Sequence, residues 1–106
     1  MWTVETLNAV VDSEVEQLPV EMRARLVRLG SIIEAVGFDG LPSDTFKHLE
    51  DKLWELRLRG KDGIARAIYV TAVRRRVVIV RVFVKKTQKT PKHELELARQ
   101  RAKEVK

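Results

Sequence analysis

The spacing of apolar residues changes along this chain, and that change limits the folds open to it. Up to Val36 the apolar positions recur every three or four residues, which is the period of a helix packed along one side. From Trp54 onward apolar and polar residues alternate, which is the period of a half-buried strand. Helical and strand patterns occupy separate segments, and this separation predicts an α+β fold.

Local signals place the first elements in order. A strand is predicted over residues 2–7, followed by a helical hairpin over residues 8–36 with Asn8 as its first cap and Gly37 as its last. Residues 38–51 contain glycine, proline and several polar residues, and we predict a loop there.

Three strands and a helix complete the prediction. The strands are expected over residues 54–59, 64–73 and 77–84, and the helix after Thr90, with Thr90 as its cap and Pro91 in its first turn. Short connections favour antiparallel pairing of these strands. The predicted order is β-α-α-β-β-β-α, a small twisted antiparallel sheet with an N-terminal helical hairpin and a C-terminal helix.

The strand over residues 77–84 is almost wholly apolar, so we expect it at the centre of the sheet. Strict alternation places four valines on one of its faces and Arg81 on the other. The valines of this face are Val78, Val80, Val82 and Val84. We expect the hairpin to cover the valine face, which leaves a basic face opposite it.

Length and composition limit the domain count and the compartment. With 106 residues the chain has room for one core, so residues 1–106 are expected to form one domain. It has no cysteine, which excludes a disulfide framework and a thiolate metal site. No apolar run is long enough to span a bilayer and no leader opens the chain, so we expect a cytoplasmic protein without membrane contact.

Charge is divided unevenly along the chain. Residues 1–53 carry five Lys/Arg and ten Asp/Glu, whereas residues 54–106 carry sixteen Lys/Arg and five Asp/Glu. The strand pattern gathers the candidate RNA-binding cations on one face or at its exit: Arg57, Arg59, Arg66, Arg81, Lys85, Lys86, Lys89 and Lys92. Such a group favours a polyanionic partner, because arginine binds phosphate oxygens in pairs. The alternative is a solvated basic surface with no partner.

A basic face of this kind can also carry chemistry on RNA. Cleavage at a 2′-hydroxyl needs a base, an acid and a group that stabilises the pentavalent phosphate, and Arg66, held rigidly inside its strand, is the catalytic candidate for the last of these roles. Neighbouring cations make a lysine a better base, so Lys85 and Lys86 are candidates, and histidine exchanges protons near neutral pH, so His48 and His93 are candidates too. The histidines lack the company of metal ligands, so no metal or other cofactor is expected.

The sequence resembles the phage-derived HigB branch of the RelE/ParE toxin superfamily over nearly its whole length. The segment from residue 83 to residue 91 is its most specific part. The matching segments are Phe46-Lys47-His48-Leu49, Leu53-Trp54-Glu55-Leu56-Arg57, Gly63-Ile64-Ala65-Arg66 and Phe83-Val84-Lys85-Lys86-Thr87-Gln88-Lys89-Thr90-Pro91, before an alanine-rich helix.

The resemblance implies the toxin of a type II toxin–antitoxin system, a metal-independent endoribonuclease that cleaves mRNA on the ribosome and arrests growth. It also implies a cognate antitoxin of the helix-turn-helix, HigA-like kind, and a larger toxin–antitoxin complex on operator DNA. Matched residue by residue, the family's strand arginines fall on Arg57 and Arg66, its lysines on Lys85 and Lys86, and its histidine on His48. The late tyrosine of RelE has no match here, and His93 is the nearest substitute.

Two other functions are compatible with the same pattern. ParE-type members of the superfamily inhibit DNA gyrase and are not nucleases, and a non-catalytic nucleic-acid-binding protein would also need a basic face. The set of Arg66, Lys85 and Lys86 favours RNA over gyrase as the target.

Overall fold

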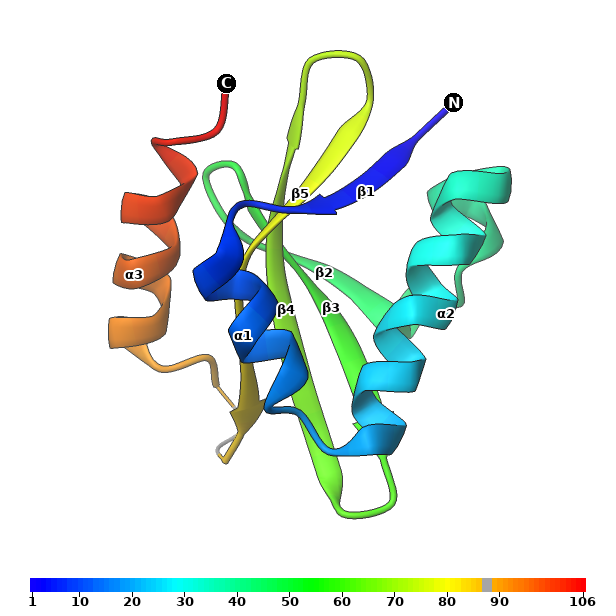
Figure 1. The fold of residues 1–106 in the computed structure, drawn as a ribbon, viewed down its shortest axis with the longest axis vertical. Helices are drawn as coiled ribbons and strands as arrows, with labels where there is room; N and C mark the ends of the chain where they lie inside the picture. Colours follow the sequence, from blue (N-terminus) through cyan, green and yellow to red (C-terminus); the bar gives the residue numbers. More distant parts are fainter. Residues whose placement is uncertain (87–88) are drawn as a thin grey trace.

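The structure, a computed structural model, describes residues 1–86 and 89–106 and confirms the α+β fold, with three helices around a five-stranded sheet (Figure 1). Thr87 and Gln88, which belong to the segment where the family resemblance is most specific, lie outside the described residues. The elements are β1 (Thr3–Thr6), α1 (Ala9–Glu16), α2 (Val20–Val36), β2 (Phe46–Glu50), β3 (Leu53–Gly60), β4 (Gly63–Ala72), β5 (Arg76–Lys85) and α3 (Lys92–Ala102).

The strands lie in the order β1-β5-β4-β3-β2. The last three strands pair antiparallel, as predicted, and β2 also pairs antiparallel with β3, whereas β1 pairs parallel to β5. The central strand is β4, so the prediction that β5 is central was wrong. Because β1 pairs only with Arg76 to Ile79, the second half of β5 lies beyond the pairing with β1.

The predicted loop over residues 38–51 contains β2, and this part of the prediction was wrong. The strand is a short, largely polar edge strand, so it lacks the apolar alternation that marks an internal strand. Phe46 fixes it on the sheet, since its ring lies 5.6 Å from that of Phe38 and 6.3 Å from that of Trp54. Two short 3-10 turns, Phe38–Gly40 and Ser43–Thr45, lead into the strand.

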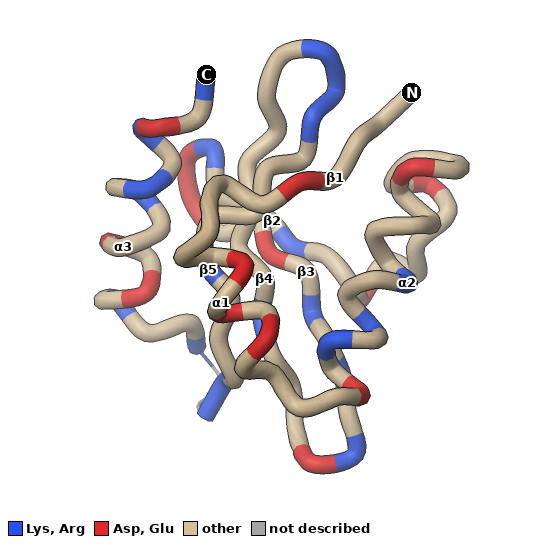
Figure 2. The backbone as a smooth tube through the Cα atoms, in the orientation of Figure 1, with Lys and Arg blue, Asp and Glu red and all other residues tan. Residues whose placement is uncertain are grey.

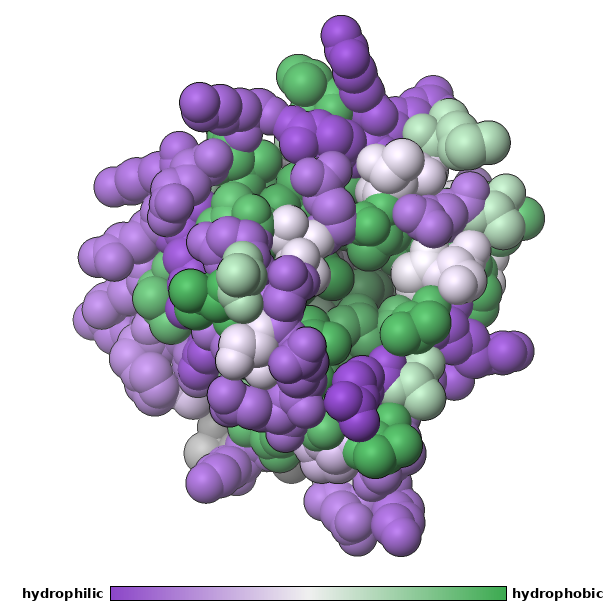
Figure 3. Space-filling view, in the orientation of Figure 1, coloured by the Kyte–Doolittle hydropathy of each residue, from purple (hydrophilic) through white to green (hydrophobic). Residues whose placement is uncertain are grey.

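Two hydrophobic layers separate the helices. Met22, Leu26, Leu29 and Ile33 of α2 pack with the inward side chains of β3 and β4, whereas Ala98 of α3 packs on the opposite face. Figure 1 shows α2 and α3 on opposite sides of the strands. In the space-filling view, apolar side chains gather in the middle of the molecule and hydrophilic ones surround them (Figure 3).

A β-bulge in β5 divides the valines that were predicted to share one face. Ile68 pairs with Arg81 and Tyr69 with Ile79, so Val80 is the extra residue. Val78 and Val80 therefore pack in the layer of α3, and Val82 packs in the layer of the hairpin. The prediction that the hairpin covers all four valines was wrong, because alternation cannot reveal an inserted residue.

The predicted helix ends were correct for the hairpin and wrong for α3. Asn8 Oδ1 accepts a hydrogen bond from the Val11 amide (3.1 Å), and Gly37 ends α2 with φ at 79°. Helix α3 begins after Pro91, without a side-chain cap. The hydroxyl of Thr90 instead donates to a carboxylate on β3.

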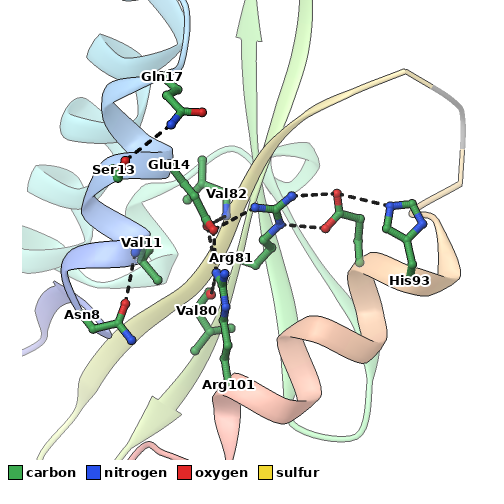
Figure 4. Close-up of polar contacts among 11 residues, drawn as sticks. Asn8, Val11, Ser13, Glu14, Gln17, Val80, Arg81, Val82, His93 and Arg101 are labelled. Atoms are coloured by element: carbon green, nitrogen blue, oxygen red, sulfur yellow. Dashed lines mark hydrogen bonds and ion pairs between the residues drawn. The ribbon is translucent and has the colours of Figure 1, made fainter.

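Four charged side chains join α1, β5 and α3 (Figure 4). Glu14 lies 2.8 Å from the guanidinium groups of both Arg81 and Arg101, and Arg81 forms two hydrogen bonds to Glu94, at 2.7 and 3.1 Å. The same network binds the β5 backbone, because Val82 N–H donates to Glu14 and Arg101 donates to the Val80 carbonyl. Side chains thus occupy the edge of β5 where β1 has ended.

Glu14→Ala is expected to lower the free energy of unfolding by about 3–5 kcal/mol, because it leaves two partly buried arginines without their shared carboxylate. Chemical denaturation measures the free energy of unfolding of this variant and of a control, Glu16→Ala. Glu16 is an exposed glutamate on the same helix, and its replacement is expected to change the free energy of unfolding by no more than about 0.5 kcal/mol. Equal stabilities would contradict a structural role for the network.

Candidate functional site

The sheet register brings cations from several strands together on the face that carries α3. Arg57, Arg66 and Phe83 stand directly opposite one another on β3, β4 and β5. On one side of this row lies the pair Ile64 and Lys85. On its other side Glu55 pairs with Lys47 of β2. Figure 2 shows basic positions along β3 and at the end of β5.

Glu55 lies at the centre of these cations and is fully buried. Its Oε2 accepts hydrogen bonds from Arg66 Nη1 and from Arg57 Nε (3.3 Å), and its Oε1 accepts one from the Thr90 hydroxyl (3.2 Å). We call this group of five the Glu55 cluster: Glu55, Arg57, Arg66, Lys85 and Thr90. One carboxylate thus orients two guanidinium groups and ties down the segment that leads into α3.

Arg66 lies on the predicted face, but it does not project into solvent. It is 5% exposed, and Glu55 holds one end of its guanidinium. Its Nε is buried and has no hydrogen-bond partner among the described residues. A buried donor left without an acceptor costs about 1–3 kcal/mol, so a shift of this side chain that brings Nε to an oxygen acceptor is favoured.

Lys85 is half-buried at the end of β5, beside these arginines. Partial burial and the nearby charges of Arg66 and Arg57 lower the pKa of the Lys85 amine, although Glu55 acts in the opposite direction. An amine whose pKa is lowered releases its proton more readily near neutral pH. The direction of this pKa shift is the one expected of a base, and the catalytic role of Lys85 stays a prediction.

The remaining predicted RNA-binding cations are exposed lysines or arginines that form ion pairs. Arg59 is exposed and lies 3.5 Å from Asp44. Exposed lysines occupy the exit of β5 and the start of α3, at Lys86, Lys89 and Lys92. Arg81 is part of the ion-pair network, and its hydrogen bond to Glu94 raises its pKa further. Its charge is thereby compensated by Glu94 and Glu14, which makes it a structural residue rather than a free phosphate ligand.

The two histidines do not meet each other. The His48 ring lies 5.0 Å from that of Trp54, on the hairpin side of the sheet, and its Nε2 donates to the Asp51 carbonyl (2.8 Å). His48 is therefore on the face opposite to the Glu55 cluster. His93 is exposed in the first turn of α3, with Nε2 3.7 Å from Glu94 (Figure 4).

Other features of the described residues limit the chemistry of the site. Within this part of the chain, no group of three or more histidine, cysteine or carboxylate residues is arranged to hold a metal ion. Tyr69 is buried in the hairpin layer, and burial raises its pKa, so it packs in the core and does not lie on the basic face. Among the described helices, none is both long and apolar enough to cross a bilayer.

Glu55 and Thr90 are members of the site that the sequence did not predict. A usable signal existed for Glu55, because alternation places it on the same face as Arg57, two residues later on the same strand. No local signal connects Thr90 to that strand, since the two residues are 35 positions apart and meet only in the fold.

The arrangement can bind one phosphodiester group. Two guanidinium groups and one amine surround a single carboxylate, so the cluster keeps a net positive charge after its internal ion pairs are formed. The donors are held by strand backbones and by Glu55, and preorganised donors stabilise developing negative charge best.

Most of the chain matches one protein family. Residues 13–103 match the family described as "Phage derived protein Gp49-like (DUF891)". The matched segment contains the whole Glu55 cluster. Among curated proteins, no sequence matches the chain.

Glu55→Gln is expected to lower the free energy of unfolding by about 3–5 kcal/mol, because Arg66 then remains buried without its counterion. Added sulfate should restore part of this loss by occupying the same place, and denaturation with and without sulfate measures both effects. Glu96→Gln, on the exposed side of α3, is the control. A Glu55→Gln protein as stable as this control would contradict the assigned role.

Proposed function

The chain belongs to the phage-derived Gp49-like family, which is part of the RelE-like toxin group, and on this premise we propose that it is an mRNA-cleaving toxin acting at the ribosome. The observation that carries the proposal is the Glu55 cluster, which combines a buried arginine with an unpaired donor and a lysine of lowered pKa. These are the groups that cleavage of RNA at a 2′-hydroxyl requires without a metal ion.

In the proposed complex a phosphodiester group lies over Arg66 and Arg57. In this complex the Arg66 side chain shifts so that its buried Nε reaches and donates to a nonbridging oxygen, while Glu55 keeps its hydrogen bond to Nη1. Glu55 is too deeply buried to reach a ribose hydroxyl, so it acts as a positioning residue and not as the base. The exposed lysines and Arg59 extend the contact along the RNA backbone.

The proposed reaction is a transfer within the RNA strand. The deprotonated amine of Lys85 takes the proton of the 2′-hydroxyl, whose oxygen then bonds to phosphorus. Arg66 and Arg57 stabilise the pentavalent phosphate, and the bond to the 5′-oxygen breaks. That oxygen takes a proton from Lys86 or from water. The products are a 2′,3′-cyclic phosphate and a 5′-hydroxyl end.

A cytoplasmic toxin of this kind must be neutralised by its host cell. We therefore include in the proposal a cognate antitoxin, of the helix-turn-helix kind that the sequence resemblance implies, and a toxin–antitoxin complex on operator DNA. The positive charge of residues 54–106 makes a partner with acidic segments suitable. Co-expression with the neighbouring reading frame should restore growth and yield a stable complex.

Arg66→Lys is expected to reduce cleavage a hundredfold or more, by about 2.7–4 kcal/mol of transition-state stabilisation, because lysine keeps the charge beside Glu55 but loses the fork of donors. Lys85→Ala should abolish toxicity. Sequencing of the 5′ ends of cellular mRNA after brief induction measures cleavage directly.

Arg74→Ala is the matched control, because Arg74 is an exposed arginine on the turn between β4 and β5. Its cleavage pattern should equal that of the unchanged protein. If Arg66→Lys and Lys85→Ala both remain fully toxic, the assignment of the site is wrong. Growth arrest with intact mRNA and broken chromosomal DNA would instead favour gyrase as the target.

A further inference from the structure

A small hollow opens beside the edge of β5, one strand away from Arg66. Its volume is about 220 Å³, and it lies between the end of α1 and residues 81–84 of β5. Gln17 and Leu18 line it on the helix side, and Phe83 and Val84 line it on the strand side. None of the residues that take part in the proposed reaction lines this hollow.

The register connects this hollow to the Glu55 cluster. Phe83 stands directly opposite Arg66, and neighbouring strands are separated by about 4.8 Å. A nucleotide whose phosphate lies over Arg66 therefore has its base within reach of Phe83 and of the hollow beyond it. Phe83 is only half-buried, so part of its ring remains available for contact.

We propose that this hollow binds one nucleobase next to the phosphate held by Arg66, an inference that rests on the proposed function. Phe83 supplies a surface for stacking, and the Gln17 side-chain amide reads the polar edge of the base. An amide offers both donors and acceptors, so it can distinguish bases by their hydrogen-bonding pattern.

The other polar groups of the hollow are already engaged, which leaves this role to Gln17. Glu14 accepts hydrogen bonds from Val82 N–H and from Arg101, and it also pairs with Arg81 (Figure 4). Gln17 is exposed, and among the described residues its side chain makes one hydrogen bond, to the Ser13 hydroxyl, which is long at 3.4 Å. It can turn toward a ligand at little cost.

The chemistry of the edge favours a base over an added peptide strand. A strand that paired with β5 here would need the Val82 N–H and the Val80 carbonyl, and Glu14 and Arg101 already bind both groups. The hollow is also smaller than the roughly 300–1,000 Å³ typical of drug-sized ligand sites, which suits a single flat ring.

Binding of four homohexameric RNAs of A, C, G and U tests the proposal. All riboses carry 2′-O-methyl groups, so that nothing is cleaved, and fluorescence anisotropy measures each affinity. The unchanged protein should bind its preferred hexamer about tenfold or more tightly than the weakest one. Gln17→Ala should reduce that ratio below about threefold, and Phe83→Leu should weaken all four by roughly fivefold to a hundredfold.

Gln100→Ala and Phe46→Leu are the matched controls, since Gln100 is an exposed glutamine on α3 and Phe46 is a half-buried ring in the hairpin layer. Both should behave as the unchanged protein. If Gln17→Ala keeps the ratio and Phe83→Leu keeps the affinities, the hollow is no base site, and it then serves a protein partner or nothing.

Failure of the base site is separable from failure of the proposed function. Lost discrimination in Gln17→Ala supports the base site even if mRNA is never cleaved in cells. Cleaved mRNA combined with unchanged affinities in both variants overturns the base site and leaves the nuclease proposal standing. No binding of any hexamer by the unchanged protein overturns the base site as well.

Discussion

The burial of the Glu55 carboxylate is the constraint on which the rest of the basic face depends. Removing a carboxylate from water costs several kcal/mol unless cations and hydrogen-bond donors replace the water. Arg57, Arg66 and Thr90 supply those partners from two strands and from the segment before α3. In return Glu55 holds Arg66 in one orientation, with Nε left for another acceptor. The same ion pairs thus contribute to stability and prepare a place for an anion.

The two faces of the sheet serve different purposes because they are covered differently. The hairpin packs over the inward side chains of β3, β4 and β5. On the other face α3 packs mainly over Ile68, Val70, Val78 and Val80, so the rows that contain Arg57, Arg66 and Lys85 lie at the far ends of the strands. The bulge at Val80 makes this possible, since it supplies apolar contacts to α3 while keeping Arg81 beside Glu94.

Periodicity and capping signals were sufficient for most of the fold. They gave the hairpin, four of the five strands and α3, because each has a strong local pattern of its own. They failed for β2, whose polar edge position hides its strand character, and for the bulge in β5, which changes no residue type. For the site, alternation found the face of Arg57 and Arg66. Alternation did not identify Glu55, because a carboxylate among cations is typical of an exposed strand residue, and only the structure shows that Glu55 is buried. Nor did it identify Thr90, which contacts Glu55 only in the folded protein.

The central claim is that Arg66 Nε binds a phosphate oxygen of RNA. Arginine side-chain NMR of ¹⁵N-labelled protein, titrated with a 2′-O-methyl uridine dinucleotide that cannot be cleaved, observes this N–H directly. The account predicts a downfield shift of the Arg66 Hε resonance and slower exchange with water as the dinucleotide saturates, while the Arg74 signal stays unchanged. An Arg66 Hε that does not move, with binding shown by shifts elsewhere, would contradict the account.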